Sequence, residues 1–154
     1  MGLVASTDRR PVFYFIGDSI TEQASDPSKS GFITLLQDHY VRSVDMINRG
    51  LSGYTTKWRH GDRTNAAAGK YAHACVELAA EENVHVLDLH TYFNTTFPDV
   101  NERQTYFVDG LHFSAKGHKE VGKLLSVAIN GMFDKEELKR FDKWQLPYWH
   151  DFIH

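Results

Sequence analysis

Short apolar runs alternate along this chain with stretches in which apolar residues recur at helical spacing. The first run, residues 12–16, is unbroken and ends just before Ser19, which predicts a strand that is buried on both faces and stops in a tight turn. Residues 44–48 and 84–89 predict two further strands. Strands that alternate with helices indicate an α/β fold with a parallel sheet.

The helical patterns lie between and after these runs. Residues 31–40 predict a helix that joins the first two strands in a βαβ unit. A second helix begins at Thr64 or Asn65, either of which can cap its first turn, and residues 114–131 carry the apolar face of a third. The tail from Asp134 carries further apolar residues, and we expect it to pack back on the body.

Length and composition indicate one hydrophobic core. The chain has 154 residues, of which 42% are hydrophobic, and no repeat or linker divides it, so we expect a single domain, 1–154. The 17 Lys and Arg residues against 20 Asp and Glu residues leave a net charge of −3. Because no basic field results, nucleic acid is not an expected partner.

Several features bear on location and cofactors. No apolar run approaches the roughly 20 residues that span a bilayer, so we expect a cytoplasmic protein without stable membrane insertion. The N-terminal letters MGLVAS fit a weak N-myristoylation pattern at Gly2, and one acyl chain gives only reversible membrane binding. Cys75, among alanines, is expected to be a small buried side chain, and the nine histidines lack ligand spacing, so no metal or cofactor is expected.

Candidate chemistry is concentrated at Ser19, Asp109 and His112. Ser19 follows the buried strand at its carboxyl end, where open parallel sheets place their ligand crevices. A serine nucleophile needs an imidazole base whose other nitrogen is held by a carboxylate, and Asp109 and His112 could supply both from one loop. Taken alone, D-x-x-H also fits an ordinary loop aspartate and a surface histidine. We expect Asp18 to brace the turn.

Motifs across most of the chain resemble the SGNH (GDSL-type) serine hydrolases. The first block reads FIGDSITE at 15–22, the second NRGLSGY at 48–54 and the last VDGLH at 108–112. The phrases RTN at 63–65, VLDL at 86–89 and LPYW at 146–149 resemble, in the same order, the branch of isoamyl acetate-hydrolysing esterases.

The resemblance implies a flavodoxin-like α/β/α fold and hydrolysis of short-chain, acetate-type carboxylic esters. In this interpretation Ser19 attacks the carbonyl, His112 moves its proton and Asp109 orients His112. The family builds its oxyanion hole from the serine N–H, a glycine N–H and an asparagine side chain. The first two map onto Ser19 and Gly53, and no residue corresponds to the asparagine.

The family's third block, G-x-N-D, is missing. The residues around Trp58 run almost directly into Arg63, so the domain is shortened near 58–63 by about two strand–helix units, or roughly 60 residues. We therefore expect a truncated fold with a reduced parallel sheet, in which the strand at 84–89 docks beside the first. Loss of one oxyanion donor typically lowers turnover by about 10²- to 10³-fold.

Two hypotheses for function remain at this point. The first is a serine esterase acting on small-molecule esters, impaired by the loss of the oxyanion asparagine. The second is an inactive splice variant or pseudoenzyme that acts, if at all, by binding. Tyr54 and Trp58 could line a substrate pocket or merely pack. Strand edges left open by the missing segment predict self-association.

Overall fold

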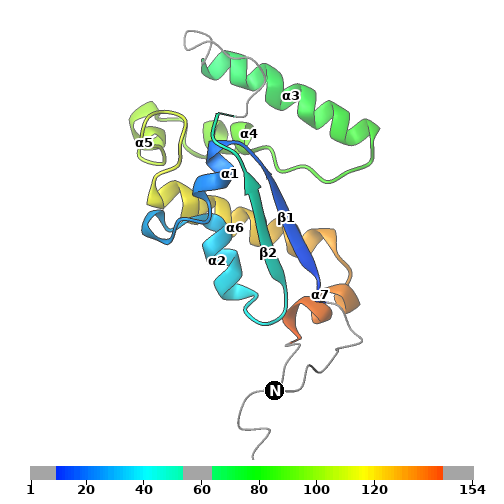
Figure 1. Ribbon diagram of the computed structural model, residues 1–154. Helices are drawn as coiled ribbons and strands as arrows, with labels where there is room; N and C mark the ends of the chain where they lie inside the picture. Colours follow the sequence, from blue (N-terminus) through cyan, green and yellow to red (C-terminus); the bar gives the residue numbers. More distant parts are fainter. Residues whose placement is uncertain (1–9, 54–63, 144–154) are drawn as a thin grey trace, which may run out of the picture.

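A computed structural model describes residues 10–53 and 64–143, as a mostly helical α/β arrangement with a small parallel sheet (Figure 1). The elements of these residues are, in order, β1 (Val12–Gly17), α1 (Ser19–Gln23), the 3-10 helix η1 (Pro27–Lys29), α2 (Phe32–His39), β2 (Asp45–Gly50), α3 (Asn65–Glu81), α4 (Leu89–Thr96), α5 (Val100–Gln104), α6 (Ala115–Met132) and α7 (Lys135–Asp142). The predicted α/β fold with a reduced sheet is confirmed.

The first two strands form the predicted βαβ unit. β1 and β2 pair in parallel, from Val12 opposite Asp45 to Gly17 opposite Gly50. The chain between them contains α1, η1 and α2, and α2 buries Phe32, Ile33 and Leu36. The carboxyl ends of both strands lie at the same end of the sheet. There the turn leading to Ser19 lies beside the loop that follows β2, and the N–H of Leu51 donates to the carbonyl of Gly17.

The core lies on one side of the sheet. The ring of Phe13 on β1 contacts Phe133 and Phe141 at centroid distances of 6.4 and 5.3 Å, and Phe15 contacts Phe32 at 6.4 Å. Phe141 belongs to α7, so the described part of the tail packs back on the body as expected.

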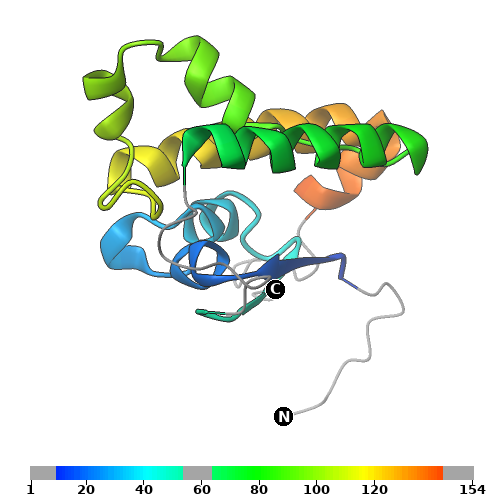
Figure 2. The same ribbon diagram turned by 90° about the horizontal axis from the view of Figure 1, so that it is seen from above.

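The opposite face of β1 is open in the described part of the chain. Tyr14 and Ile16 are 63% and 82% exposed. Figure 2, in which the sheet is seen close to edge-on, places α3 and α6 on the same side of it. The expectation that β1 is buried on both faces is therefore wrong. A run of apolar residues shows that the side chains are apolar, but whether they are buried depends on which other elements pack over them.

The third expected strand does not form. Residues 84–88 have no regular structure, Leu89 begins α4, and Val84 and Val86 are exposed. The N–H of Val84 donates to the carbonyl of Ala79 at 2.9 Å and joins no sheet ladder. A strand requires a neighbour, and the central strands that would flank this one are absent, so its docking beside β1 is also wrong.

The helix α3 begins as predicted but stays at the periphery. Thr64 caps it, with its side-chain oxygen accepting from the N–H of Ala67 at 3.1 Å. Its main contacts are with α4, and Ala79 is its one buried residue. Cys75 is exposed, so the expectation of a buried cysteine is wrong.

Candidate active site

Ser19 lies where β1 turns into α1. Asp18 caps this helix, because its carboxylate accepts from the N–H of Ile20 at 2.9 Å, and Asp18 therefore braces the turn as expected. Gly17 permits the turn, since a Cβ there would lie 2.3 Å from the Oγ1 of Thr21. The N–H of Ser19 is one of the first in α1, which have no acceptor within the helix.

The loop that carries Asp109 and His112 closes back on itself. Phe107 and Phe113 form an antiparallel bridge, and the N–H of Val108 donates to the carbonyl of His112 at 2.9 Å. Gly110 has a φ of 81°, a conformation that favours glycine. The loop thus has a defined conformation that sets Asp109 and His112 side by side.

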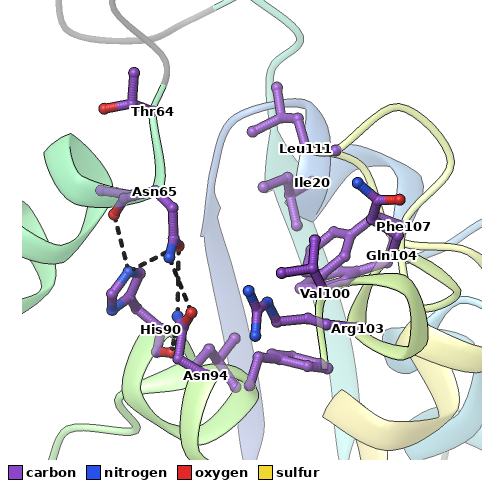
Figure 3. A pocket seen from close by; sticks show the side chains of 15 residues that line it. Ile20, Thr64, Asn65, His90, Asn94, Val100, Arg103, Gln104, Phe107 and Leu111 are labelled. Carbon is purple, nitrogen blue, oxygen red and sulfur yellow. Dashed lines mark hydrogen bonds between the residues drawn. The ribbon is translucent and has the colours of Figure 1, made fainter. Parts of the chain in front are cut away.

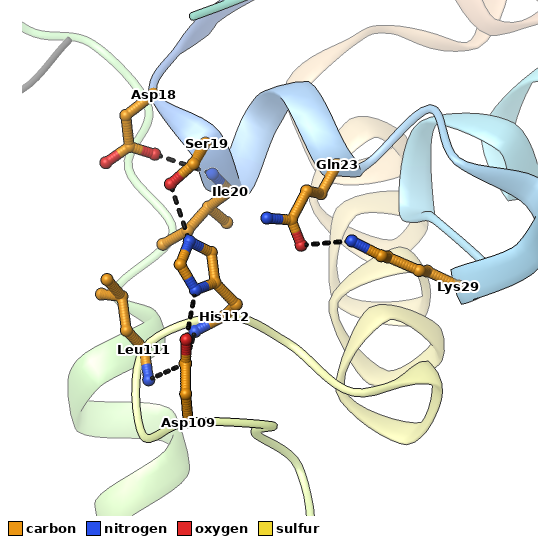
Figure 4. A network of polar contacts seen from close by, with 8 residues as sticks. All are labelled: Asp18, Ser19, Ile20, Gln23, Lys29, Asp109, Leu111 and His112. Carbon is orange, nitrogen blue, oxygen red and sulfur yellow. Dashed lines mark hydrogen bonds and ion pairs between the residues drawn. The ribbon is translucent and has the colours of Figure 1, made fainter. Parts of the chain in front are cut away.

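Ser19, His112 and Asp109 form one chain of hydrogen bonds (Figure 4). The Oγ of Ser19 lies 2.8 Å from Nε2 of His112, and Nδ1 of the same ring lies 2.6 Å from Oδ2 of Asp109. Oδ1 of Asp109 accepts from the N–H groups of Leu111 and His112 at 3.0 and 2.8 Å. Side chains that are 93 residues apart in the sequence are thus brought into direct contact.

The electrostatics of this chain are set by Asp109. Hydrogen bonds from the side chain and backbone of His112, with a further one from the Leu111 N–H, lower the pKa of Asp109 to about 2. An ionised Asp109 accepts a hydrogen bond from the Nδ1–H group of His112. This tautomer leaves the lone pair of Nε2 facing the hydroxyl of Ser19, which is the arrangement a general base requires.

Asn48 and Glu22 hold the loop after β2 against α1, which sequence reasoning missed. The amide of Asn48 donates to the carbonyl of Thr21 and to the Oγ of Ser25, both at 2.7 Å. The carboxylate of Glu22 accepts from the N–H of Ser52 at 2.6 Å. Asn48 thereby braces the site and has its amide donors engaged.

The other residues predicted for the site have different outcomes. Gly53 follows β2 in this loop with a φ of 77°, and its role as an oxyanion donor stays a prediction. Tyr54 and Trp58 lie outside the described residues.

A pocket of about 490 Å³ is lined by residues next to these three in the sequence, although none of the three lines it (Figure 3). It touches their sequence neighbours Ile20, Gly110 and Leu111. Sequence reasoning missed this pocket. Its lining residues come from several separate segments, the first at Ile20 and the last at Phe113, and only the fold brings these segments together. Its lining residues are Ile20, Thr64, Asn65, Ala68, Leu89, His90, Phe93, Asn94, Val100, Arg103, Gln104, Phe107, Gly110, Leu111 and Phe113.

The described residues contain neither a cluster of metal ligands nor a membrane-spanning helix. Within residues 10–53 and 64–143, no group of three or more His, Cys, Asp or Glu side chains could hold a metal ion. Among the same residues, no helix has the length and apolar character needed to cross a membrane.

Comparison with known proteins identifies the family. The model of the GDSL-like lipase/acylhydrolase family matches residues 59–125. The isoamyl acetate-hydrolyzing esterase 1 homolog of Mus musculus is 33% identical over 229 aligned positions, which cover 92% of this chain and 88% of that protein. The chain belongs to the GDSL family of hydrolases. The isoamyl acetate-hydrolyzing esterase 1 homolog of Homo sapiens is 33% identical over 90 residues, or 58% of this chain and 32% of that protein. A GDSL esterase/lipase of Arabidopsis thaliana is 48% identical over 50 residues, or 32% of this chain and 20% of that protein.

The mouse alignment also bears on the missing segment of this GDSL protein. It runs over 229 positions and this chain has 154 residues, so at least 75 positions, the difference of the two, hold no residue of this chain. This number of unmatched positions is of the same order as the two strand–helix units expected from the missing G-x-N-D block, and the place of the shortening near 58–63 stays a prediction.

Proposed function

We propose that this chain hydrolyses short-chain carboxylic esters by a serine acyl-enzyme mechanism. The observation that carries the proposal is the continuous hydrogen-bonded chain from Ser19 through His112 to Asp109, with distances of 2.8 and 2.6 Å. Membership of the GDSL family supports the same reaction class. Acetate-type esters are the proposed substrates, in keeping with the name of the mouse relative.

The proposed reaction has two halves. The Oγ of Ser19 attacks the ester carbonyl while Nε2 of His112 takes its proton, and the same proton then goes to the departing alcohol. Water, deprotonated by His112, attacks the acyl-enzyme and releases the carboxylic acid and free Ser19. Asp109 stays ionised throughout and stabilises the imidazolium that forms in each half.

The oxyanion hole is the weak part of this site. The N–H groups of Ser19 and Gly53 are the proposed donors, and no G-x-N-D block supplies an asparagine. Since loss of one donor typically lowers kcat by about 10²- to 10³-fold, we expect this chain to be slower than full-length relatives by that order. The same deficit supports the second candidate function, in which the chain has lost turnover and acts only by binding.

The test compares the wild type with Ser19→Ala in two assays. Hydrolysis of a short-chain nitrophenyl ester should fall to the uncatalysed rate in Ser19→Ala and stay unchanged in the control Ser126→Ala, which removes a hydroxyl on α6. A fluorophosphonate probe should label the wild type on Ser19, as located by peptide mass spectrometry, since only an activated serine reacts readily. A wild type that is neither labelled nor faster than Ser19→Ala would favour the binding function.

A further inference from the structure

The pocket beside Ser19 is placed to receive one end of a bound ester. Ile20 follows Ser19 directly, and Gly110 and Leu111 lie between Asp109 and His112, so three lining residues of the pocket are immediate neighbours of the residues proposed to react. Its wall on this side is mostly apolar, with Ile20, Phe107, Val100 and Leu111, and also carries the amide of Gln104 (Figure 3). A hydrocarbon chain attached to the ester would therefore lie along this wall.

The opposite wall is polar but already satisfied. Nδ2 of Asn65 donates to Oδ1 of Asn94 at 2.9 Å, and Nδ2 of Asn94 donates to the carbonyl of His90 at 2.8 Å. Nε2 of His90 lies 3.0 Å from Oδ1 of Asn65. These three side chains bond to one another, so their polar groups are already engaged.

Arg103 differs from every other side chain in the pocket. It is the one permanently charged group among the 15 lining residues, and none of them is Asp or Glu. In the described part of the chain its hydrogen bonds all leave from Nη1, to the carbonyls of Phe97 at 2.7 Å and Pro98 at 3.4 Å. No described carboxylate lies within ion-pair distance of it.

We propose that Arg103 makes this pocket a subsite for a carboxylate, so that the preferred substrates are small esters with a carboxylate at the far end of the acyl or alcohol chain. Nη1 anchors the side chain to the loop after α4, which leaves Nη2 and Nε to donate to an anion in the pocket. An apolar wall between Ser19 and a lone guanidinium matches a short hydrocarbon chain between ester and carboxylate. The inference rests on the proposed function, because it takes Ser19 as the attacking group.

The test measures binding without turnover, by calorimetry on Ser19→Ala. The ligands are monoethyl adipate, with the charge on the acyl side, and the acetate ester of a hydroxyhexanoic acid, with the charge on the alcohol side. Neutral partners of matched length are diethyl adipate, ethyl hexanoate and hexyl acetate. We expect at least one anionic ester to bind about tenfold or more tighter than its neutral partner, since hydrogen bonds to charged groups have about that effect. Equal binding of charged and neutral partners would overturn the proposal without any Arg103 variant.

Variants on the Ser19→Ala background assign the effect to Arg103. Arg103→Gln should abolish the preference, and Arg103→Lys, which keeps the charge without the planar fork, should retain part of it. The matched control is Lys139→Gln, which removes a positive charge from the exposed face of α7 and should leave the preference unchanged. A preference that survives Arg103→Gln in a folded variant would contradict the assignment.

The subsite and the proposed function fail in different ways. Binding that favours the anionic ester, together with wild-type protein that hydrolyses no ester, would leave the subsite standing and remove the esterase proposal. Hydrolysis that depends on Ser19 but shows no preference for anionic esters would do the reverse.

Discussion

At the scale of single residues, two imidazoles show how surroundings assign different properties to one side chain. His112 has a hydrogen-bond partner at each ring nitrogen, Ser19 on one side and Asp109 on the other. His118 on α6 is 1% exposed, and neither of its ring nitrogens has a partner in the described residues. The first arrangement suits proton transfer, whereas the second favours the neutral ring and lowers the pKa of His118.

Replacing Asp109 by Asn tests the proposed orientation of His112. The amide would favour the wrong tautomer of the ring, so we expect ester turnover to fall by about a thousandfold or more while the fold is kept, because Asp109 is 54% exposed. Steady-state kinetics and circular dichroism check this. A loss of less than about tenfold would show that His112 is not held by Asp109 during the reaction.

The low pKa of Asp109 also bears on the pH dependence of activity. Its folded pKa of about 2 lies below the ordinary 3.8, so Asp109 adds stability above about pH 4 and loses it as the pH falls towards 2. Asp109 is therefore ionised throughout the range of an ester assay. We expect the ionisation of Asp109 to contribute nothing to the pH dependence of kcat/KM above about pH 4, as steady-state kinetics across pH would show.

His118→Leu should stabilise the protein in acid. The ring of His118 is flanked by the rings of Phe32 and Phe113. Its burial lowers its pKa, Lys29 adds a smaller effect in the same direction, and Asp26 opposes the shift. Because the unfolded ring binds a proton below about pH 6.5 and the folded ring resists it, stability falls as the pH drops below that value. Thermal unfolding at pH 7.5 and pH 5.5 should show a larger loss for the wild type than for His118→Leu. Equal losses would mean that His118 has a polar partner.

At the scale of elements, neighbours decide whether a strand-like sequence becomes a strand. Residues 12–17 and 84–89 are both rich in apolar and β-branched side chains. The first finds β2, and the second finds no partner among the described residues and continues into α4. Phe93 on α4 packs on Phe107 and Phe113, and these aromatic contacts anchor α4 in place of strand pairing.

Paired substitutions test this view of residues 84–88. Val86→Ser should change the free energy of unfolding by no more than about 0.5 kcal/mol, as an exposed position outside any sheet. Phe93→Ala should cost about 3–5 kcal/mol, because the ring is buried and contacts Tyr106 and Phe113 at 5.4 and 6.0 Å. Denaturant unfolding measures both. A loss of 2 kcal/mol or more for Val86→Ser, above the range of about 0.5 for such surface changes, would indicate a buried strand.

At the scale of the whole molecule, the described sheet is small and open. It has two strands, one outer face with exposed Tyr14 and Ile16, and edges that no other described strand covers. Open strand edges, and an exposed apolar face beside them, favour association with another chain. We propose that residues 1–154 form one domain that self-associates through the exposed side of β1.

Tyr14→Lys tests this self-association. A charge on the open face of β1 should shift the protein towards the monomer in size-exclusion chromatography with light scattering. Val127→Lys is the matched control, since Val127 is also exposed but lies on α6. A wild type that is monomeric at all concentrations, or equal effects of the two variants, would contradict the assignment to β1.

The sequence by itself determined the local features of this protein. The extent of the strand before Ser19, the helix between the first two strands, the Thr64 cap and the helix from Ala115 follow from periodicity, turn residues and capping groups that are close together in the chain. The D-x-x-H spacing likewise allows Asp109 and His112 to lie side by side, because the four residues of one loop segment carry both side chains. Such features depend on interactions within a few residues, which the order of amino acids specifies directly.

Only the tertiary structure decided the rest. Whether Val84–Leu89 becomes a strand depends on neighbours from distant parts of the chain, and so does the exposure of Tyr14 and Ile16 on β1. The pocket, and with it the place of Arg103, is formed by segments that meet only after folding. Burial and strand pairing both require contact between segments that lie far apart in the sequence, so the residues of one segment alone do not determine them.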